Sequence, residues 1–302
     1  MLARLLCALA VVVALAANAG AATSGPTASI EGSILFRCGD NLCSVAPDGS
    51  GRKQLTKDGR SGGPSYGWLS ASKDGSRLGV AYGNKAYILD RSGRRVKGPF
   101  RSTGGGVLVV QIRPDGRQIA TIEQVFEILT PPPPSPSIEV ITPYLFLTSA
   151  SGAGRDTVAR TTATTGWLGN RLMRDDSADA EPFEQLICLL ASNADSDCAR
   201  PLAVDPGREL WGPAASPDGR YIAAARAPLK KLAGQIAVYR SATGERVRSV
   251  TSGTGDSQPS WSPDGKRIVF TRGRALYVVS ATGGPARKIA AGIQPVWVTA
   301  PS

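Results

Sequence analysis

Short apolar runs alternate with corners rich in Gly and Pro along most of the chain. The run Leu276-Tyr277-Val278-Val279 is typical of a β-strand, and a Gly-containing turn follows it. Gly and Pro are frequent and spread along the chain, as turn residues are in a β-rich protein. Outside the N-terminus no amphipathic helical pattern continues over three turns. The pattern therefore predicts an all-β fold.

One phrase recurs, a corner containing Asp-Gly followed by an apolar strand. The corner aspartates are Asp74, Asp115, Asp218 and Asp264. The interval is 41 residues from the first to the second and 46 from the third to the fourth. The intervening 103 residues leave room for an insertion and one degenerate unit. Because Pro presets φ, Gly accepts positive φ and Asp caps the turn, we interpret these aspartates as turn-forming residues rather than a catalytic ring.

Each unit of roughly 40 residues contains four predicted strands, named A to D in chain order. Strand A ends at the Asp-Gly corner, and strand B is the apolar run that follows the corner. Strand C alternates, and strand D is more polar, as suits an outer edge. A four-stranded unit of this length is typical of a β-propeller blade.

The two ends of the chain together predict how the ring closes. Residues Ile34–Leu55 overlay Ile268–Ile289 at a constant offset of 234, but no strand A precedes them. Residues Gln294–Trp297 repeat Gln258–Trp261 just before the chain stops. We therefore expect the last strand to complete the first blade, which leaves no open edge in the ring. The six predicted blades are residues 33–56 with 294–299, 65–97, 106–158, 164–205, 210–250 and 257–290.

The N-terminus has the pattern of a secretory signal. Arg4 precedes a short apolar stretch and small residues, with Ala-x-Ala cleavage sites ending at Ala19 or Ala21. The stretch is too short to span a bilayer comfortably. We expect a cleaved signal over residues 1–21, a linker over 22–32 and one propeller domain over 33–302. The mature protein is then periplasmic or extracellular and does not span a membrane.

Four cysteines remain after cleavage, and an even number in an exported protein favours disulfides. Close spacing favours the pairs Cys38–Cys43 and Cys188–Cys198, although three pairings are open. A zinc site is disfavoured because the sequence has no Cys-x-x-Cys pair and no His.

The formal net charge is +11. Such a surface could contact an anionic envelope polymer or lipid, or it could simply keep the protein soluble, which is the interpretation we prefer. The basic residues are scattered, with no basic helix and no basic-aromatic platform. This excludes nucleic acid as the expected partner.

The repeat, most complete in "PSWSPDGKRIVF" followed by "LYVV", resembles the propeller repeat of TolB-type periplasmic proteins, and the resemblance covers nearly all of the expected mature chain. The Trp of the phrase occurs at Trp167, Trp261 and Trp297, whereas Ala71, Ile112 and Ala215 replace it elsewhere. TolB-like proteins carry an additional N-terminal α/β domain, for which we find no room in this chain. Their partner, peptidoglycan-associated lipoprotein, is therefore not carried over.

The connections between strands B and C carry the irregular segments. Blade 3 has an insertion containing Pro131, Pro132, Pro133 and Pro134, and blade 4 has an acidic segment containing Asp175, Asp176, Asp179 and Glu181. Long loops on a rigid scaffold commonly form binding faces, so we expect this face to bind a protein partner. The alternative is that both segments are neutral surface insertions.

Catalytic signatures are scarce. Without His there is no Ser-His-Asp triad, and no Gly-x-Ser-x-Gly motif is present. We predict no catalytic residue and no cofactor, and favour a non-catalytic binding module or envelope scaffold. The alternative is an enzyme of lactonase or hydrolase type, with carboxylates or a metal such as Ca²⁺ in the central channel, where six strands A converge without a linear motif.

Overall fold

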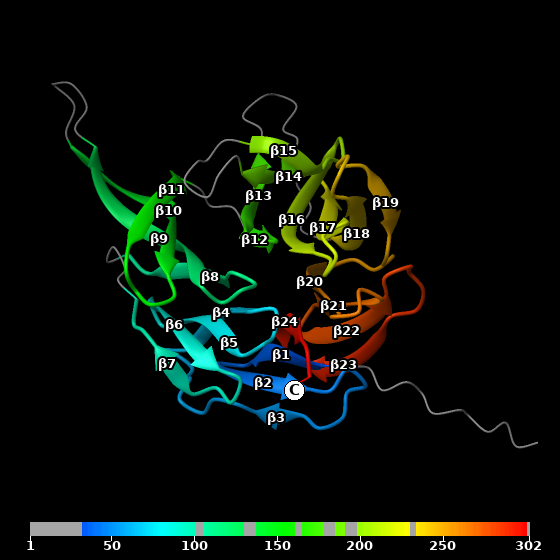
Figure 1. Ribbon diagram of the computed structural model, residues 1–302, viewed down its shortest axis with the longest axis horizontal. Helices are drawn as coiled ribbons and strands as arrows, with labels where there is room; N and C mark the ends of the chain where they lie inside the picture. The colour runs from blue at the N-terminus through cyan, green and yellow to red at the C-terminus, as the bar shows by residue number, and fades with distance from the viewer. Residues whose placement is uncertain are drawn as a thin grey trace, which may run out of the picture.

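The computed structural model describes residues 32–100, 105–129, 137–160, 165–177, 185–190, 198–229 and 234–300. Every regular element in these ranges is a β-strand, and the strands form six antiparallel sheets of four strands each. The sheets are arranged around a common axis as the blades of a propeller (Figure 1). The predicted fold class is confirmed.

The first three blades follow one another from the N-terminus, and the strands of each are ordered from the innermost outward. Blade 1 consists of β24 (Ile293–Val298), β1 (Ser33–Cys38), β2 (Asn41–Val45) and β3 (Lys53–Gln54). Blade 2 consists of β4 (Tyr66–Ala71), β5 (Arg77–Tyr82), β6 (Lys85–Asp90) and β7 (Arg95–Lys97). Blade 3 consists of β8 (Val107–Ile112), β9 (Gln118–Leu129), β10 (Ile138–Ser149) and β11 (Arg155–Arg160).

The other three blades complete the ring. Blade 4 consists of β12 (Thr165–Leu168), β13 (Arg171–Ser177), β14 (Gln185–Leu190) and β15 (Cys198–Ala203). Blade 5 consists of β16 (Arg208–Ala215), β17 (Tyr221–Pro228), β18 (Gln235–Arg240) and β19 (Arg246–Ser249). Blade 6 consists of β20 (Asp256–Trp261), β21 (Arg267–Arg272), β22 (Ala275–Ser280) and β23 (Arg287–Ala291).

The C-terminal strand closes the ring as the repeat predicted. Strand β24 pairs antiparallel with β1, so that Trp297 lies opposite Ile34. The guanidinium of Arg91 in blade 2 donates to the carbonyls of Asp74 (2.6 Å) and Thr299 (2.9 Å). The end of the chain is therefore held by pairing within blade 1 and by hydrogen bonds to blade 2.

The apolar core lies mainly between neighbouring blades. In one cluster, Phe36 of blade 1 packs with Val269 and Leu276 of blade 6, and Trp297 completes the contact. Neighbouring Asp-Gly corners also touch, since the Lys73 amide donates to the Pro114 carbonyl (2.8 Å). Contacts of this kind join the blades into one rigid ring.

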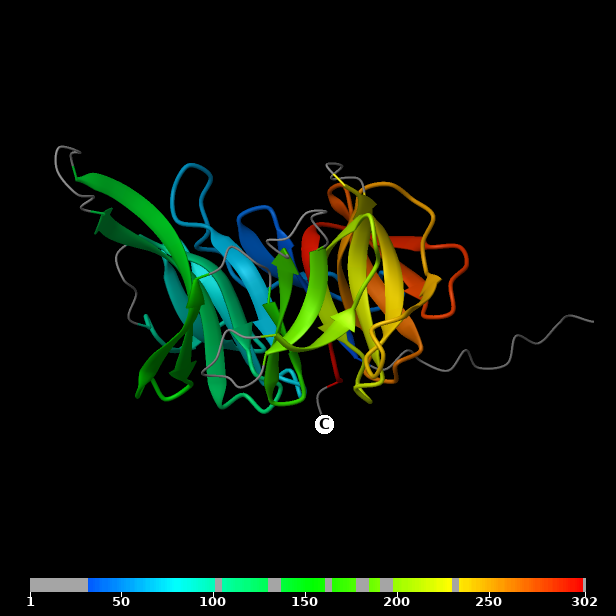
Figure 2. The ribbon, with the colours of Figure 1, turned by 90° about the horizontal axis from the view of Figure 1, so that it is seen from above.

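Two segments that we expected to be loops contain strand residues. In blade 3, β9 and β10 continue outward as a hairpin that projects beyond the rest of the ring (Figure 2). In blade 4, β13 continues through Asp175 and Asp176, which lie opposite Ile187 and Leu186. Both corrections have one cause: pairing continues wherever the partner strand supplies backbone hydrogen bonds, whatever the charge or Pro content of the nearby sequence.

Candidate functional site

The projecting hairpin of blade 3 consists of Gln124–Leu129 and Ile138–Pro143, and is called the arm. The pairing of β8 with β9 ends at Glu123, and that of β11 with β10 ends at Tyr144. Beyond these points the two arm strands pair with each other, and at the root the Gln124 backbone N–H also donates to the Gly106 carbonyl (3.0 Å). Six residues of antiparallel strand span about 20 Å, so the arm is a sizeable two-stranded ribbon.

One face of the arm exposes large apolar side chains. Phe126 and Ile141 are directly opposed and are 51% and 54% exposed. Ile128, two residues from Phe126 and therefore on the same face, is 73% exposed. Half of the large exposed apolar side chains in the described ranges thus lie on this one ribbon face. In the sequence, this apolar face is indicated by Phe126 and Ile128, which are two positions apart with a polar residue between them.

The base of the arm is fixed by a buried ion pair. The Glu123 carboxylate, 1% exposed, accepts from the Arg155 guanidinium (2.8 Å) and from the Thr121 hydroxyl (2.8 Å). The Arg155 guanidinium also lies over the ring of Phe146, 3.8 Å from its centre. One step further out, the Tyr144 hydroxyl donates to Glu127 (2.5 Å). These contacts hold the root of the arm in one orientation relative to the ring.

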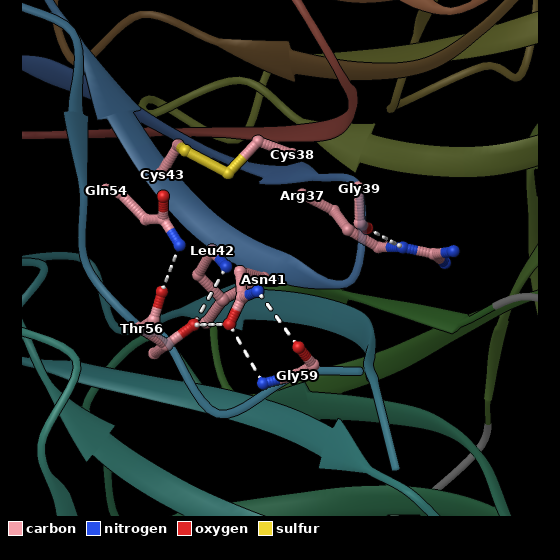
Figure 3. Close-up of a disulfide and its surroundings, with 9 residues drawn as sticks. All are labelled: Arg37, Cys38, Gly39, Asn41, Leu42, Cys43, Gln54, Thr56 and Gly59. Carbon is pink, nitrogen blue, oxygen red and sulfur yellow. Dashed lines mark hydrogen bonds between the residues drawn. A yellow bond between two sulfur atoms is a disulfide. The ribbon is translucent and has the colours of Figure 1, made fainter. Parts of the chain in front are cut away.

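In blade 1 a disulfide crosslinks the two strands of the B–C hairpin next to its turn. Cys38 and Cys43 form a disulfide with a Cα–Cα distance of 5.8 Å (Figure 3). Behind it, Thr56 accepts from the Leu42 amide (3.0 Å), and Asn41 accepts from the Gly59 amide (3.0 Å). The hairpin and the connection to blade 2 are thereby joined. The second disulfide, Cys188–Cys198, links β14 to β15 in blade 4, and both pairings are those favoured by spacing.

The other predicted contact residues give no continuous site in the described part of the chain. Pro131, Pro132, Pro133 and Pro134, together with Asp179 and Glu181, lie outside the described residues. Asp175 lies in β13 and is half-buried. Among the described residues, the arm is therefore the candidate binding surface.

The corner aspartates are occupied by hydrogen bonds within their own turns. Asp74 accepts from the Ser72 hydroxyl (2.6 Å) and the Ser76 amide (3.0 Å), and Asp218 and Asp264 accept in the same way from the Ser two residues before and the amide two residues after. The hydroxyl of Ser72 lowers the pKa of Asp74, and Arg113 does so for Asp115. These hydrogen bonds to the aspartates shape the corners.

Positive charge follows the free edges of the blades. Each of the six outer strands carries at least one Lys or Arg: Lys53, Arg95 and Lys97, Arg155 and Arg160, Arg200, Arg246 and Arg248, Arg287 and Lys288. Charges on an exposed edge strand oppose pairing with another sheet edge. These ten residues are part of the 35 Lys and Arg of the chain, so the fold explains a part of its basic character. Within the described ranges, no helix of the length and apolarity needed to cross a membrane occurs.

The innermost strands of all six blades line a central cavity of about 200 Å³. Its wall is made of Pro, Gln, Trp, small residues and the aliphatic residues Leu69, Ile112 and Val296, and none of the side chains that line it is charged. The carboxylates that the channel-enzyme alternative requires are therefore not found in this wall.

Comparisons with known proteins give fold relatives. Neither a protein-family model nor a curated protein matches the sequence. The structure of TolB from Acinetobacter baumannii is 15% identical with a TM-score of 0.65, over 89% of this chain and 67% of that one. A protein described as TolB from Agrobacterium tumefaciens is 18% identical with a TM-score of 0.61, over 88% and 92%. A chain of the nidogen/laminin complex is 10% identical with a TM-score of 0.63, over 88% and 98%. These similarities show that the chain has a TolB-like six-bladed propeller fold.

Proposed function

We propose that the protein is an exported, non-catalytic binding module that holds a protein partner on the apolar face of the arm. The observation that carries this proposal is the set Phe126, Ile128 and Ile141, exposed together on a ribbon whose base is rigid. The two disulfides support export, because such bonds persist in oxidising compartments such as the periplasm.

The energetics favour a covered arm. Burying a large apolar side chain fully is worth about 1.5–3 kcal/mol, and these three side chains still expose half or more of their area. A partner that covers them gains about 1–2 kcal/mol for each, which together corresponds to a change in Kd of at least about 100-fold. A two-stranded ribbon with no other support in water is at best marginally stable, so the partner also stabilises the arm.

The fold relatives are compatible with a binding role. A chain with this fold occurs in the nidogen/laminin complex, and propellers of this kind host many unrelated functions on one scaffold. The uncharged channel wall gives no support to the enzyme alternative. An anionic envelope polymer is a weaker candidate, because the basic residues of the outer strands are spread over all six blades.

The test is affinity capture from envelope and culture-fluid extracts, followed by titration of the purified captured protein. The arm variant carries Phe126→Ser, Ile128→Ser and Ile141→Ser. The matched control carries Val96→Ser, Leu108→Ser and Leu229→Ser, which remove three exposed apolar side chains elsewhere.

We expect the wild type and the control to bind one partner with the same Kd, and the arm variant to bind it at least about 100-fold more weakly. Equal binding by all three proteins would place the partner elsewhere and overturn the proposal. Capture of nothing by the wild type in either extract would also count against it. Far-UV circular dichroism checks that the variants keep the fold.

A further inference from the structure

The central cavity has the chemistry of a binding site of its own, separate from the arm. The residues of its wall include Trp68 and Trp167, the prolines Pro259 and Pro295, and the glutamines Gln111, Gln258 and Gln294. Ligand sites combine a mainly apolar wall with a few polar groups that set orientation. Since the lining side chains are all uncharged, the wall suits a neutral ligand.

Two glutamines occupy equivalent places in the wall but differ in their hydrogen bonds. Gln258 and Gln294 each precede a Pro in the innermost strand, and both have a φ of 54°. The side-chain oxygen of Gln258 accepts from the Thr271 hydroxyl (3.0 Å) and from the backbone N–H of Gln294 (3.1 Å). The side-chain oxygen of Gln294 is buried and has no such partner among the described residues.

The cause of this difference can be read from the repeat. The offset of 234 that relates blade 6 to blade 1 places Arg37 where blade 6 has Thr271, so blade 1 lacks the hydroxyl. In blade 2 the position equivalent to both glutamines is Trp68, three residues before Ala71. The sequence thus leaves Gln294 without the contacts that hold Gln258 in place.

Trp68 differs from the repeat tryptophans Trp167 and Trp261 because its indole N–H has no acceptor among the described residues. The indole N–H groups of Trp261 and Trp167 donate to the carbonyls of Ala214 (3.0 Å) and Gln111 (3.4 Å) in the preceding blades. The indole N–H of Trp68 is buried and has no acceptor among the described residues. A buried donor and a buried acceptor without partners, in adjacent blades of one cavity wall, are unfavourable in the free protein.

We propose that the central channel binds a neutral carbohydrate, with Gln294 accepting from one sugar hydroxyl and the Trp68 indole donating to another. A hydroxyl both donates and accepts, so one class of ligand satisfies both groups. The aromatic and Pro surfaces pack against the apolar face of the sugar ring. Both polar atoms are buried without a partner among the described residues, so neither gives up a hydrogen bond when its side chain turns towards the ligand.

The size of the cavity fits one sugar ring. A cavity of about 150 Å³ is enough for a benzene molecule. The channel cavity, at about 200 Å³, therefore accommodates a single monosaccharide or the terminal residue of a longer glycan. A charged sugar would have to lose water without gaining an ion pair from this wall.

The test is isothermal titration of the mature protein with D-glucose, D-galactose and N-acetyl-D-glucosamine, with D-glucuronate as the charged counterpart. The variants are Trp68→Phe, which keeps an aromatic ring but removes the indole N–H, and Gln294→Met, which keeps the length but removes the side-chain amide. The matched control is Gln235→Met, in β18 and outside the cavity wall.

We expect at least one neutral sugar to bind, with glucuronate weaker, and each channel variant to lose about tenfold or more in affinity. The Gln294→Met variant should melt no lower than the wild type, because the side-chain oxygen that it removes has no partner among the described residues. Absence of binding by every neutral sugar would overturn the proposal. So would stronger binding of glucuronate, or unchanged binding by both variants. None of these outcomes depends on the arm or on a protein partner.

Discussion

Replacing Trp297 by alanine tests whether the C-terminal strand carries the closure of the ring. Trp297 is 6% exposed and packs in the cluster that joins blade 1 to blade 6. Trp261 occupies the same place in blade 6, is 7% exposed, and lies in a blade whose four strands are continuous in sequence. The two tryptophans therefore form a matched pair that differs in how the strand is connected.

The expected loss follows from the buried volume. Truncating a buried Trp to Ala costs about 3–5 kcal/mol of unfolding free energy. For a domain of this size, each kcal/mol lowers Tm by about 2–4 °C, so Trp297→Ala should lower Tm by about 6–20 °C. Trp261→Ala should lower Tm by a similar amount, because its side chain is equally buried.

The assay is thermal unfolding followed by circular dichroism, with a chain lacking residues 300–302 as a control for the tail itself. That control should melt like the wild type, because Ala300 is exposed and lies beyond the end of β24. If Trp297→Ala melted within a degree or two of the wild type while Trp261→Ala was strongly destabilised, the last strand would not carry the closure, and this reasoning would be wrong.

Three further predictions concern acid stability and disulfides. Hydrogen bonding from Ser92 lowers the pKa of Asp90 to about 2. The stability that the Asp90 carboxylate contributes is therefore present above its unfolded pKa of about 3.9 and is lost as pH falls through about 2. The urea midpoints of the wild type and Asp90→Asn should converge between pH 5 and pH 2, and a constant gap between them would contradict this. Replacing Cys38 and Cys43 by Ser should cost about 2 kcal/mol, measured by urea unfolding, because the closed loop is short, and an unchanged midpoint would contradict it. Thiol titration of the denatured, unreduced mature protein should find no free thiol, and four would disprove both bridges.

The ring was predictable because its information is local and repeated. Each Asp-Gly corner specifies a turn, and Gly75 and Gly265 have the positive φ values (66° and 70°) that a residue with a side chain rarely adopts. The overlay of Ile34–Leu55 on Ile268–Ile289 identified a blade lacking its inner strand. Only a strand from the other end of the chain could supply it, as β24 does.

The arm and the channel wall were not predictable in the same way. The Pro run after Leu129 indicated an insertion, and a two-stranded ribbon with apolar residues on both faces gives no clean alternation of polar and apolar positions. Glu123 and Arg155, which fix its base, are 32 residues apart. Likewise, the wall brings together Trp68 and Gln294 from distant parts of the sequence, so its chemistry appears only when the ring is closed.

The most direct test of the binding function is site-specific photo-crosslinking from the arm. The photoreactive amino acid p-benzoyl-L-phenylalanine replaces Phe126 in one protein and Leu108 in a second, since both positions are exposed apolar sites of blade 3. After irradiation with extract, the account predicts one crosslinked protein from position 126 and none from position 108. A partner crosslinked from position 108 alone, or from neither position, would contradict the claim that the arm is the binding surface.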